Sequence, residues 1–201
     1  MKKVVLALLI ALLAVPAFAA EGQIGVSIAP EWFWLSSVEG AKPEESVGES
    51  TLYLSVDGAN YFGEDGGGFG IEYGLGVSIP LYGWAGKESQ RIEGDAGFIF
   101  RAGLGFRREF NDLTGLAIGF GVNGSYSGHT FDLAIASADF SALMLSIYGR
   151  VAVDLTFLDC LRLDLGIAMG GPIFTSVKAV DKSQSVDISG SFLAPFAAIS
   201  Y

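Results

Sequence analysis

One stretch of the chain sorts its side chains by size with a period of two. From Phe69 to Leu81, every odd position carries a large apolar residue, and the even positions carry glycine, glutamate, serine or proline. A β-strand places alternate residues on opposite faces, whereas a helix would mix the two sets around its circumference. The stretch is therefore predicted to be a strand with one bulky apolar face and one small, partly polar face.

The same alternation recurs along the rest of the chain and predicts eight strands. They run approximately over residues 24–34, 51–57, 69–81, 96–107, 116–126, 143–155, 161–169 and 188–201. Longer polar connections (36–50, 84–91, 127–139 and 172–187) alternate with short ones (63–68, 108–112 and 157–160). Long loops at one end and tight turns at the other are typical of an outer-membrane β-barrel.

The composition supports the same fold class. Hydrophobic residues make up 51% of the chain and charged residues only 17%, yet the chain contains 28 glycines and its only long apolar run is N-terminal. A bilayer admits only helices and closed barrels as spanning structures. We therefore expect an all-β fold, an antiparallel up-and-down transmembrane β-barrel of about eight strands.

The N-terminus has the features of a secretory signal peptide. Lys2 and Lys3 precede an apolar run over residues 4–15, and small residues at Ala17 and Ala19 suit a cleavage site. The predicted division is a signal peptide over 1–19 and a barrel over 20–201, exported to the bacterial outer membrane. A retained anchor is the alternative, although the apolar run is short of the roughly 20 residues that a spanning helix needs.

Which face of the strands points inward decides between a membrane barrel and a soluble ligand carrier. Eight strands enclose a narrow space that suits small side chains, so the bulky face should point outward into lipid. The charged residues within the predicted strands occupy the same alternate positions as the small residues, so they should also point inward. This predicts a polar network that fills the barrel interior. Its expected members are Glu31, Asp57, Glu72, Arg101, Arg107, Arg150, Asp154, Arg162 and Asp164. An ion-conducting lumen is the alternative interpretation of these residues.

Aromatic residues gather at the ends of the predicted strands. Those at the long-loop end are Trp32, Trp34, Tyr82, Trp84 and Tyr126, and those at the short-turn end are Phe69, Phe106, Phe157 and Tyr201. Amphipathic rings concentrate at the two interfaces of a bilayer, so these residues are predicted to form two aromatic belts.

With its signal peptide, alternating strands, inward arginines and carboxylates, and a terminal strand from Phe192 to Tyr201, the chain resembles small outer-membrane proteins of the OmpA, OmpX and OmpW type. The resemblance implies that the C-terminal aromatic is read by the barrel-assembly machinery during biogenesis. Pro195 departs from the pattern because proline donates no ladder hydrogen bond, which leaves the register of the last strand open.

No enzyme site, cofactor or metal is predicted. His129 is the only histidine, with Ser125, Ser127 and Asp132 nearby, and a loop hydrolase or acyltransferase is the alternative to a solvated side chain. Cys160 is the only cysteine, and the run Gly66 to Gly68 lacks the lysine and helix of a phosphate loop.

The formal net charge of −10 argues against nucleic acid and against anionic membrane surfaces as partners. Acidic residues concentrate between strands, and we expect them to be solvated rather than to bind calcium. The candidates are Glu44, Glu45, Glu49, Glu64 and Asp65. The predicted function is a structural or surface-interaction scaffold embedded in outer-membrane lipid, with acidic loops facing an extracellular partner. The alternative is a narrow porin-like channel or transporter for small or hydrophobic molecules.

Overall fold

A computed structural model describes residues 23–38, 44, 46–63, 67–92, 96–133, 136–157, 161–179, 182–185 and 188–201. All regular elements among these residues are β-strands, which form one antiparallel sheet of ten strands. No helix in the described ranges is long and apolar enough to cross a membrane.

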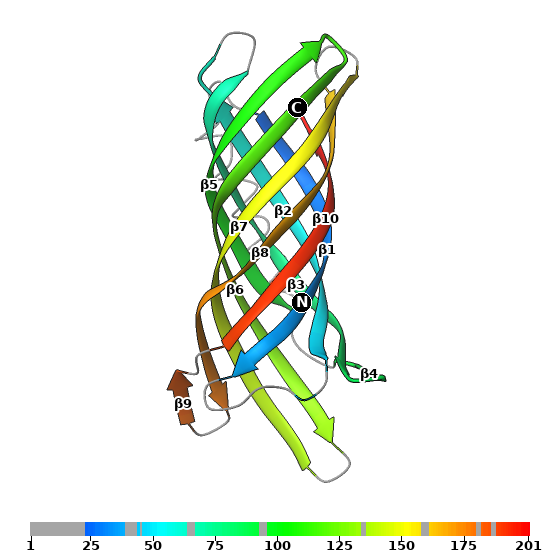
Figure 1. Ribbon diagram of the computed structural model, residues 1–201, viewed down its shortest axis with the longest axis vertical. Coiled ribbons are helices and arrows are strands. Elements are labelled where there is room, and N and C mark those ends of the chain that lie inside the picture. Colours follow the sequence, from blue (N-terminus) through cyan, green and yellow to red (C-terminus); the bar gives the residue numbers. More distant parts are fainter. Residues whose placement is uncertain are drawn as a thin grey trace.

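Eight long strands build the body of the molecule. They are β1 (Gln23–Val38), β2 (Val47–Tyr61), β3 (Gly68–Ala85), β5 (Gly97–Asn111), β6 (Thr114–Leu133), β7 (Ala136–Phe157), β8 (Leu161–Ala179) and β10 (Ile188–Ser200). The short strands β4 (Glu88–Arg91) and β9 (Lys182–Ser185) pair with the ends of β3 and β8. Each long strand pairs with the next, and β10 pairs with both β8 and β1, so the sheet closes on itself (Figure 1). The predicted antiparallel barrel of eight strands is confirmed.

Several strands are longer than predicted. The second strand, expected over 51–57, begins at Val47 and ends at Tyr61. The predicted loop 127–139 is largely a hairpin, because β6 and β7 stay paired as far as Leu133 and Ala136. The connections 84–91 and 172–187 likewise contain the ends of β3 and β8 together with β4 and β9. Backbone pairing can continue where the side chains become polar, so polar composition did not mark the strand ends.

The C-terminus lies at the end of the barrel where β5 turns into β6 (Figure 1). Tyr201 and Ile24 exchange backbone hydrogen bonds of 2.8 and 3.0 Å, which continues the pairing of β10 and β1 to this end. The β5–β6 turn is held by Asn111, whose side-chain oxygen accepts hydrogen bonds from the backbone N–H groups of Leu113 and Thr114 and from the Thr114 hydroxyl.

The two faces of the sheet differ as the alternation predicts. Large apolar side chains such as Leu75 (45% exposed) and Phe120 (64%) cover the outside, whereas Asp154 and Ser146 are fully buried. Some interior side chains are large nonetheless. One cluster packs Tyr148, Phe192 and Ala194 together with Phe33 and Ala168, and another packs Ala29, Tyr53 and Ile99 together with Phe196. Phe33, which breaks the alternation of its strand, belongs to this interior packing.

The prolines within strands coincide with irregular pairing. Beside Pro80, the β2–β3 register shifts and leaves Leu81 without a paired residue on β2, and beside Pro172 the β7–β8 register shifts and leaves Ile173 without one on β7. Proline cannot donate to a ladder, so bulges are the positions that tolerate it. Pro195 does not shift the pairing of β10 with β8, which runs in one register from Phe192 to Ser200.

Candidate functional site: the charged barrel interior

The barrel interior gathers the charged side chains that share the small-residue parity. One cavity of about 70 Å³ is lined by seven of them: Glu31, Asp57, Glu72, Arg101, Arg150, Arg162 and Asp164. The remaining two, Arg107 and Asp154, are buried and paired with each other. The structure therefore places all nine predicted residues inside the barrel, on strands β1, β2, β3, β5, β7 and β8.

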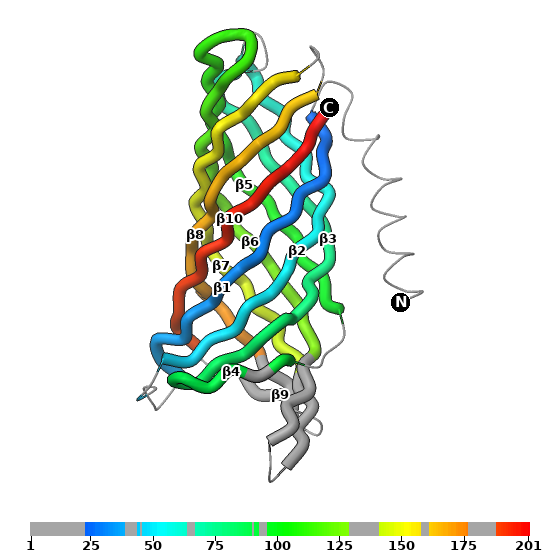
Figure 2. Tube along the Cα trace, turned by 90° about the vertical axis from the view of Figure 1, so that its right-hand side faces the viewer, coloured from blue at the N-terminus to red at the C-terminus, as the bar shows by residue number. Residues whose placement is uncertain are grey.

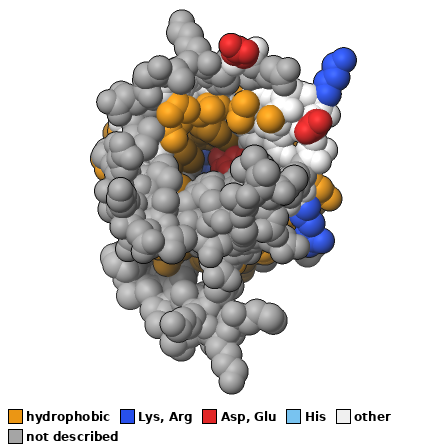
Figure 3. Space-filling view, turned by 90° about the horizontal axis from the view of Figure 1, so that it is seen from below, with side chains coloured by type: hydrophobic (Ala, Val, Ile, Leu, Met, Phe, Trp, Pro, Cys, Tyr) orange, Lys and Arg blue, Asp and Glu red, His pale blue; other side chains and the backbone are white. Residues whose placement is uncertain are grey.

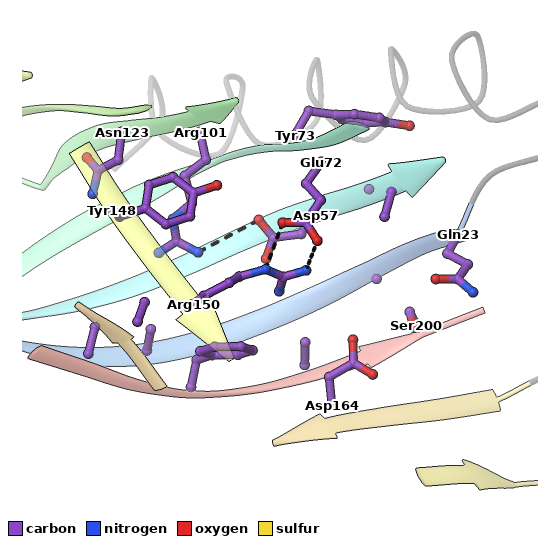
Figure 4. A pocket seen from close by; sticks show the side chains of 18 of the residues that line it. Gln23, Asp57, Glu72, Tyr73, Arg101, Asn123, Tyr148, Arg150, Asp164 and Ser200 are labelled. Carbon is purple, nitrogen blue, oxygen red and sulfur yellow. Dashed lines mark hydrogen bonds and ion pairs between the residues drawn. The ribbon is translucent and has the colours of Figure 1, made fainter. Parts of the chain in front are cut away.

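The Glu72–Arg150 pair joins β3 to β7 through the lumen (Figure 4). Arg150 Nε donates to Glu72 Oε2 at 2.8 Å and Arg150 Nη2 donates to Oε1 at 2.6 Å, so the pair is bidentate. Tyr61 Oη donates a third hydrogen bond to Glu72 Oε1 at 2.6 Å. The guanidinium also lies 5.6 Å from the centre of the Phe196 ring. Charge-assisted bidentate bonds are the strongest of their class and fix both side chains.

Glycines on the inner face make room for these carboxylates. A Cβ added at Gly105 would lie 2.3 Å from Glu72 Oε1, and one added at Gly119 would lie 2.4 Å from Glu72 Oε2. At Gly74, a Cβ would lie 2.1 Å from Asp57 Oδ1. The glycines of the inner face therefore leave the space that the charged side chains occupy.

Asp57 is held mainly by hydroxyl groups. Ser27 and Ser55 both donate to Asp57 Oδ2, the second at 3.1 Å, and their hydroxyls lie 2.8 Å from each other. Arg101 Nη1 lies 4.0 Å from Asp57 Oδ1, at the outer limit of an ion pair (Figure 4). Of the ion pairs described here, this is the longest.

Nearer the turn end, two carboxylates face each other across β7 and β8. Asp154 stands directly opposite Asp164 in the register, an arrangement that is destabilising for like charges without counterions. Arg107 Nε donates to Asp154 Oδ2 at 2.7 Å, and Arg162 Nε donates to Asp164 Oδ1 at 2.8 Å. Arg107 also reaches Glu109 at 2.9 Å. Each aspartate is thus matched with its own arginine.

Several members of the network were missed at the level of sequence. Tyr53 Oη donates to buried Glu31 at 3.1 Å, and Tyr61 bonds Glu72 as described above. Both tyrosines lie on the parity of the interior residues, as Ser27 and Ser55 do. The signal was therefore present, but a search for charges alone passes over neutral hydroxyl donors.

Polar atoms without a partner also face the cavity. They include Asn123 Oδ1, Arg162 Nη1 and Ser200 Oγ, and each belongs to a residue that lines the cavity. A volume of about 70 Å³ can hold several water molecules. Seen from the end opposite the C-terminus, hydrophobic side chains lie along one side of a hollow, and basic and acidic side chains are visible inside it (Figure 3).

The predicted belt aromatics lie on the outer surface. Trp34 and Trp84 pack edge to face with ring centres 6.3 Å apart, and Phe69 packs against Phe106 at 5.1 Å. Tyr126 stacks on Phe98 at 5.4 Å. Trp32, Tyr82, Phe157 and Tyr201 are also exposed, Tyr201 at 79%.

Some predicted features lie outside the described residues. These are the signal peptide, the side chain of His129, Glu45, Glu64, Asp65, Gly66 and Cys160. Glu44 is exposed, and Glu49 lies part-buried in β2. The described ranges contain no group of three or more histidine, cysteine, aspartate or glutamate side chains that could hold a metal ion.

Comparison with known proteins identifies a shared fold. No family model and no curated protein matches the sequence. Among solved structures, Neisserial surface protein A is 11% identical, with a TM-score of 0.52, over 89% of this chain and 95% of that chain. The outer membrane protein OprG from Pseudomonas aeruginosa is 14% identical, with a TM-score of 0.49, over 89% and 95%. The attachment invasion locus protein Ail of Yersinia pestis is 15% identical, with a TM-score of 0.42, over 89% and 99%.

The first of these likenesses extends over nearly the whole of both chains, and its low identity limits it to the fold. It agrees with the pairing pattern, in which consecutive long strands are neighbours and the last returns to the first. The chain therefore has the fold of the small eight-stranded outer-membrane β-barrels.

Proposed function

We propose that this protein is an exported outer-membrane barrel that acts as a structural and surface-interaction scaffold, with acidic connections facing a partner outside the cell. The observation that carries the proposal is the contrast between the two faces of the sheet. Bulky apolar side chains cover the outside, while paired charges and glycines occupy the axis.

The outer surface supports a bilayer environment. Large apolar side chains on all eight long strands are exposed, among them Val26, Leu54, Ile71, Leu104, Ile118, Ile147, Leu165 and Ile199. Monomeric soluble proteins rarely expose a continuous apolar surface of this kind. A closed sheet also satisfies the backbone groups of its strands internally, as hydrocarbon surroundings require. The exposed aromatics at both ends would then lie at the headgroup level of outer-membrane lipid.

The interior favours a scaffold over a pore. The Glu72–Arg150 pair crosses the lumen, and the Arg107–Asp154 and Arg162–Asp164 pairs lie nearer the turn end. Ion passage along the axis would require these charge-assisted bonds to break. A narrow channel is the second candidate, and the cavity of about 70 Å³ and the hollowed mouth are the observations that favour it (Figure 3).

The acidic connections favour a cationic partner. The net charge is −10, and the exposed Glu44 lies in the connection 36–50, whereas the connection 84–91 carries Glu88 together with the exposed Lys87 and Arg91. A net negative charge attracts cationic partners over long range. At the other end, the exposed Tyr201 would be available to the barrel-assembly machinery during insertion.

Two measurements test the proposal. Gel migration of boiled and unboiled protein in lipid vesicles should differ, as expected for a detergent-resistant barrel, and identical migration would contradict the membrane-barrel proposal.

Single-channel recording in planar bilayers should then show no conductance steps. Regular steps in the wild type would favour the channel, especially if the double variant Glu72→Gln/Arg150→Gln, which lacks the central pair, conducts more.

We assign no catalytic activity to the barrel. The hydrolase alternative depends on His129, so any esterase or acyltransferase activity of the purified protein should survive the substitution His129→Ala. Loss of a measurable activity in that variant, with gel migration unchanged, would overturn this assignment.

A further inference from the structure

Two prolines stand opposite each other where the barrel closes. Pairs between β1 and β10 follow one register from Gly25↔Ser200 to Ile28↔Ala197 and resume in the same register at Trp32↔Leu193. That register places Pro30 directly across from Pro195. The ladder is interrupted at these two residues and at the pair on either side of them. The strands β1 and β10 run side by side along the barrel wall (Figure 2).

Antiparallel ladders explain the length of this gap. Opposite residues alternate between pairs that exchange both N–H···O bonds and pairs that exchange none. Ile24 and Tyr201, in the same register, exchange both backbone hydrogen bonds, so every second pair from them does so, and Pro30 with Pro195 is one of these pairs. The neighbouring pairs exchange no bonds of their own, so the loss of the two bonds between Pro30 and Pro195 interrupts the ladder at three successive pairs. Proline has no N–H, so the carbonyl oxygens of Pro30 and Pro195 both lose their donors.

These carbonyls lie in an apolar part of the outer wall. Ile28 (46% exposed), Trp32 (38%) and Leu193 (36%) flank the gap on the outside. On the other sides of the two prolines the pairing is intact, with Pro30 opposite Leu52 and Pro195 opposite Ile167. A backbone group without a partner in hydrocarbon is costly, so the two oxygens favour the arrival of a hydrogen-bond donor.

The internal cavity lies directly behind the gap. Four residues next to the prolines, Ala29, Glu31, Ala194 and Phe196, all line the cavity. Three of them present apolar surface, and the fourth is a carboxylate that accepts a hydrogen bond from Tyr53. The gap therefore combines hydrogen-bond acceptors with apolar walls, and it has no backbone donor of its own at the two prolines.

We propose that the Pro30–Pro195 gap is a binding site for a small membrane-dissolved molecule that carries a hydrogen-bond donor, such as a hydroxyl, on an apolar body. The donor bonds the free carbonyl oxygens, and the apolar body packs among the hydrophobic side chains around the gap. The site rests on the proposed membrane location, because the ligand arrives from the bilayer.

Phenol and toluene form a matched pair of probes, since they share a ring and differ in the hydroxyl donor. Each is titrated into ¹⁵N-labelled protein in lipid nanodiscs, at equal concentrations in the membrane, while backbone amide signals are recorded. Phenol should shift the amides of Ala29, Glu31, Ala194 and Phe196 at concentrations about fivefold lower than toluene, which is the preference expected from one net hydrogen bond. The double variant Pro30→Val/Pro195→Val restores both N–H groups and should lose this preference.

Equal responses to both probes, or phenol shifts centred elsewhere, would overturn the site and leave water as the partner of the carbonyls. Survival of the phenol preference in the double variant would overturn it as well. Should that variant fail to fold, the comparison of the two probes on the wild type decides alone. The boiled and unboiled gel migration of each sample tests the membrane barrel separately, so failure of the site is distinguishable from failure of the proposed function.

Discussion

Gly119 shows how a single residue controls the interior network. Alanine at this position would bring a Cβ to 2.4 Å from Glu72 Oε2 and 3.1 Å from Arg150 Nε. Because both side chains are fixed by their bidentate pair, we expect Gly119→Ala to lower the free energy of unfolding by about 1–3 kcal/mol. Gly149→Ala is the matched control, since its nearest neighbour is Gly119 O at 3.9 Å, and its effect should be much smaller. Urea unfolding in vesicles followed by tryptophan fluorescence measures both, and equal effects would contradict the proposed role of Gly119.

The Glu72–Arg150 pair should behave as a coupled unit. Replacing either partner alone leaves a charge in the lumen without its counterion, and breaking a buried pair in this way costs about 3–5 kcal/mol. Glu72→Gln and Arg150→Met should each be strongly destabilising, and the double variant should be less destabilised than the sum of the two. A double-mutant cycle by urea unfolding gives the coupling energy. Additive effects would show that the pair does not stabilise the barrel through the contact described here.

Among the elements, the β5–β6 hairpin depends on its turn. Asn111 Oδ1 accepts three hydrogen bonds of 2.9, 2.9 and 3.0 Å from Leu113 and Thr114. Asn111→Ala removes this acceptor and should lower the free energy of unfolding by about 1 kcal/mol, because the exposed N–H groups can bond water instead. The neighbouring exposed substitution Asp112→Ala is the control and should be nearly neutral. A larger loss at Asp112 than at Asn111 would contradict the assigned role of the side chain.

The alternation of large and small residues was enough to predict the eight long strands and their two faces, because side-chain direction in a strand follows sequence position alone, whereas the short strands β4 and β9 were not predicted. Strand ends were predicted poorly. The segment 127–139 is polar enough to suggest a loop, yet most of it pairs, since hydrogen bonding between backbones does not depend on side-chain polarity. A change from apolar to polar side chains indicates where a strand enters a more polar environment. The strand itself can continue beyond that point.

The charged interior was predictable as a set but not as pairs. Parity alone indicated which residues face inward, and Glu72 and Arg150 share that parity. Their contact joins residues 78 positions apart on strands that are not neighbours, so it depends on closure and strand order. The Pro30–Pro195 gap was hidden for the same reason, because each proline alone is an irregularity and only the register of the closing strands places them together.

At the scale of the whole molecule, the proposed bilayer should make the cost of a charge depend on depth. Leu75 lies within β3 and Phe69 lies at its turn end, and both are exposed on the outer face (45% and 74%). An arginine on the lipid face costs about 2–4 kcal/mol at the bilayer midplane and about 0–1 kcal/mol near the interface. Leu75→Arg should therefore reduce the folded fraction in vesicles far more than Phe69→Arg.

The two arginine variants also separate the bilayer from other apolar surroundings of the outer face. A protein partner covering the barrel would penalise a charge according to local packing, with no regular dependence on distance from the barrel ends. Leu75→Ala removes the leucine side chain without adding a charge. Its loss of unfolding free energy measures the packing contribution, which is subtracted from the loss in Leu75→Arg. If heat-modifiable migration and unfolding free energies show equal losses for Leu75→Arg and Phe69→Arg after that correction, the outer face does not meet a bilayer at the proposed depth. A steep difference, largest at Leu75, requires a low-dielectric layer centred on the barrel, because only such a layer makes the same substitution on one strand depend on its position along the axis.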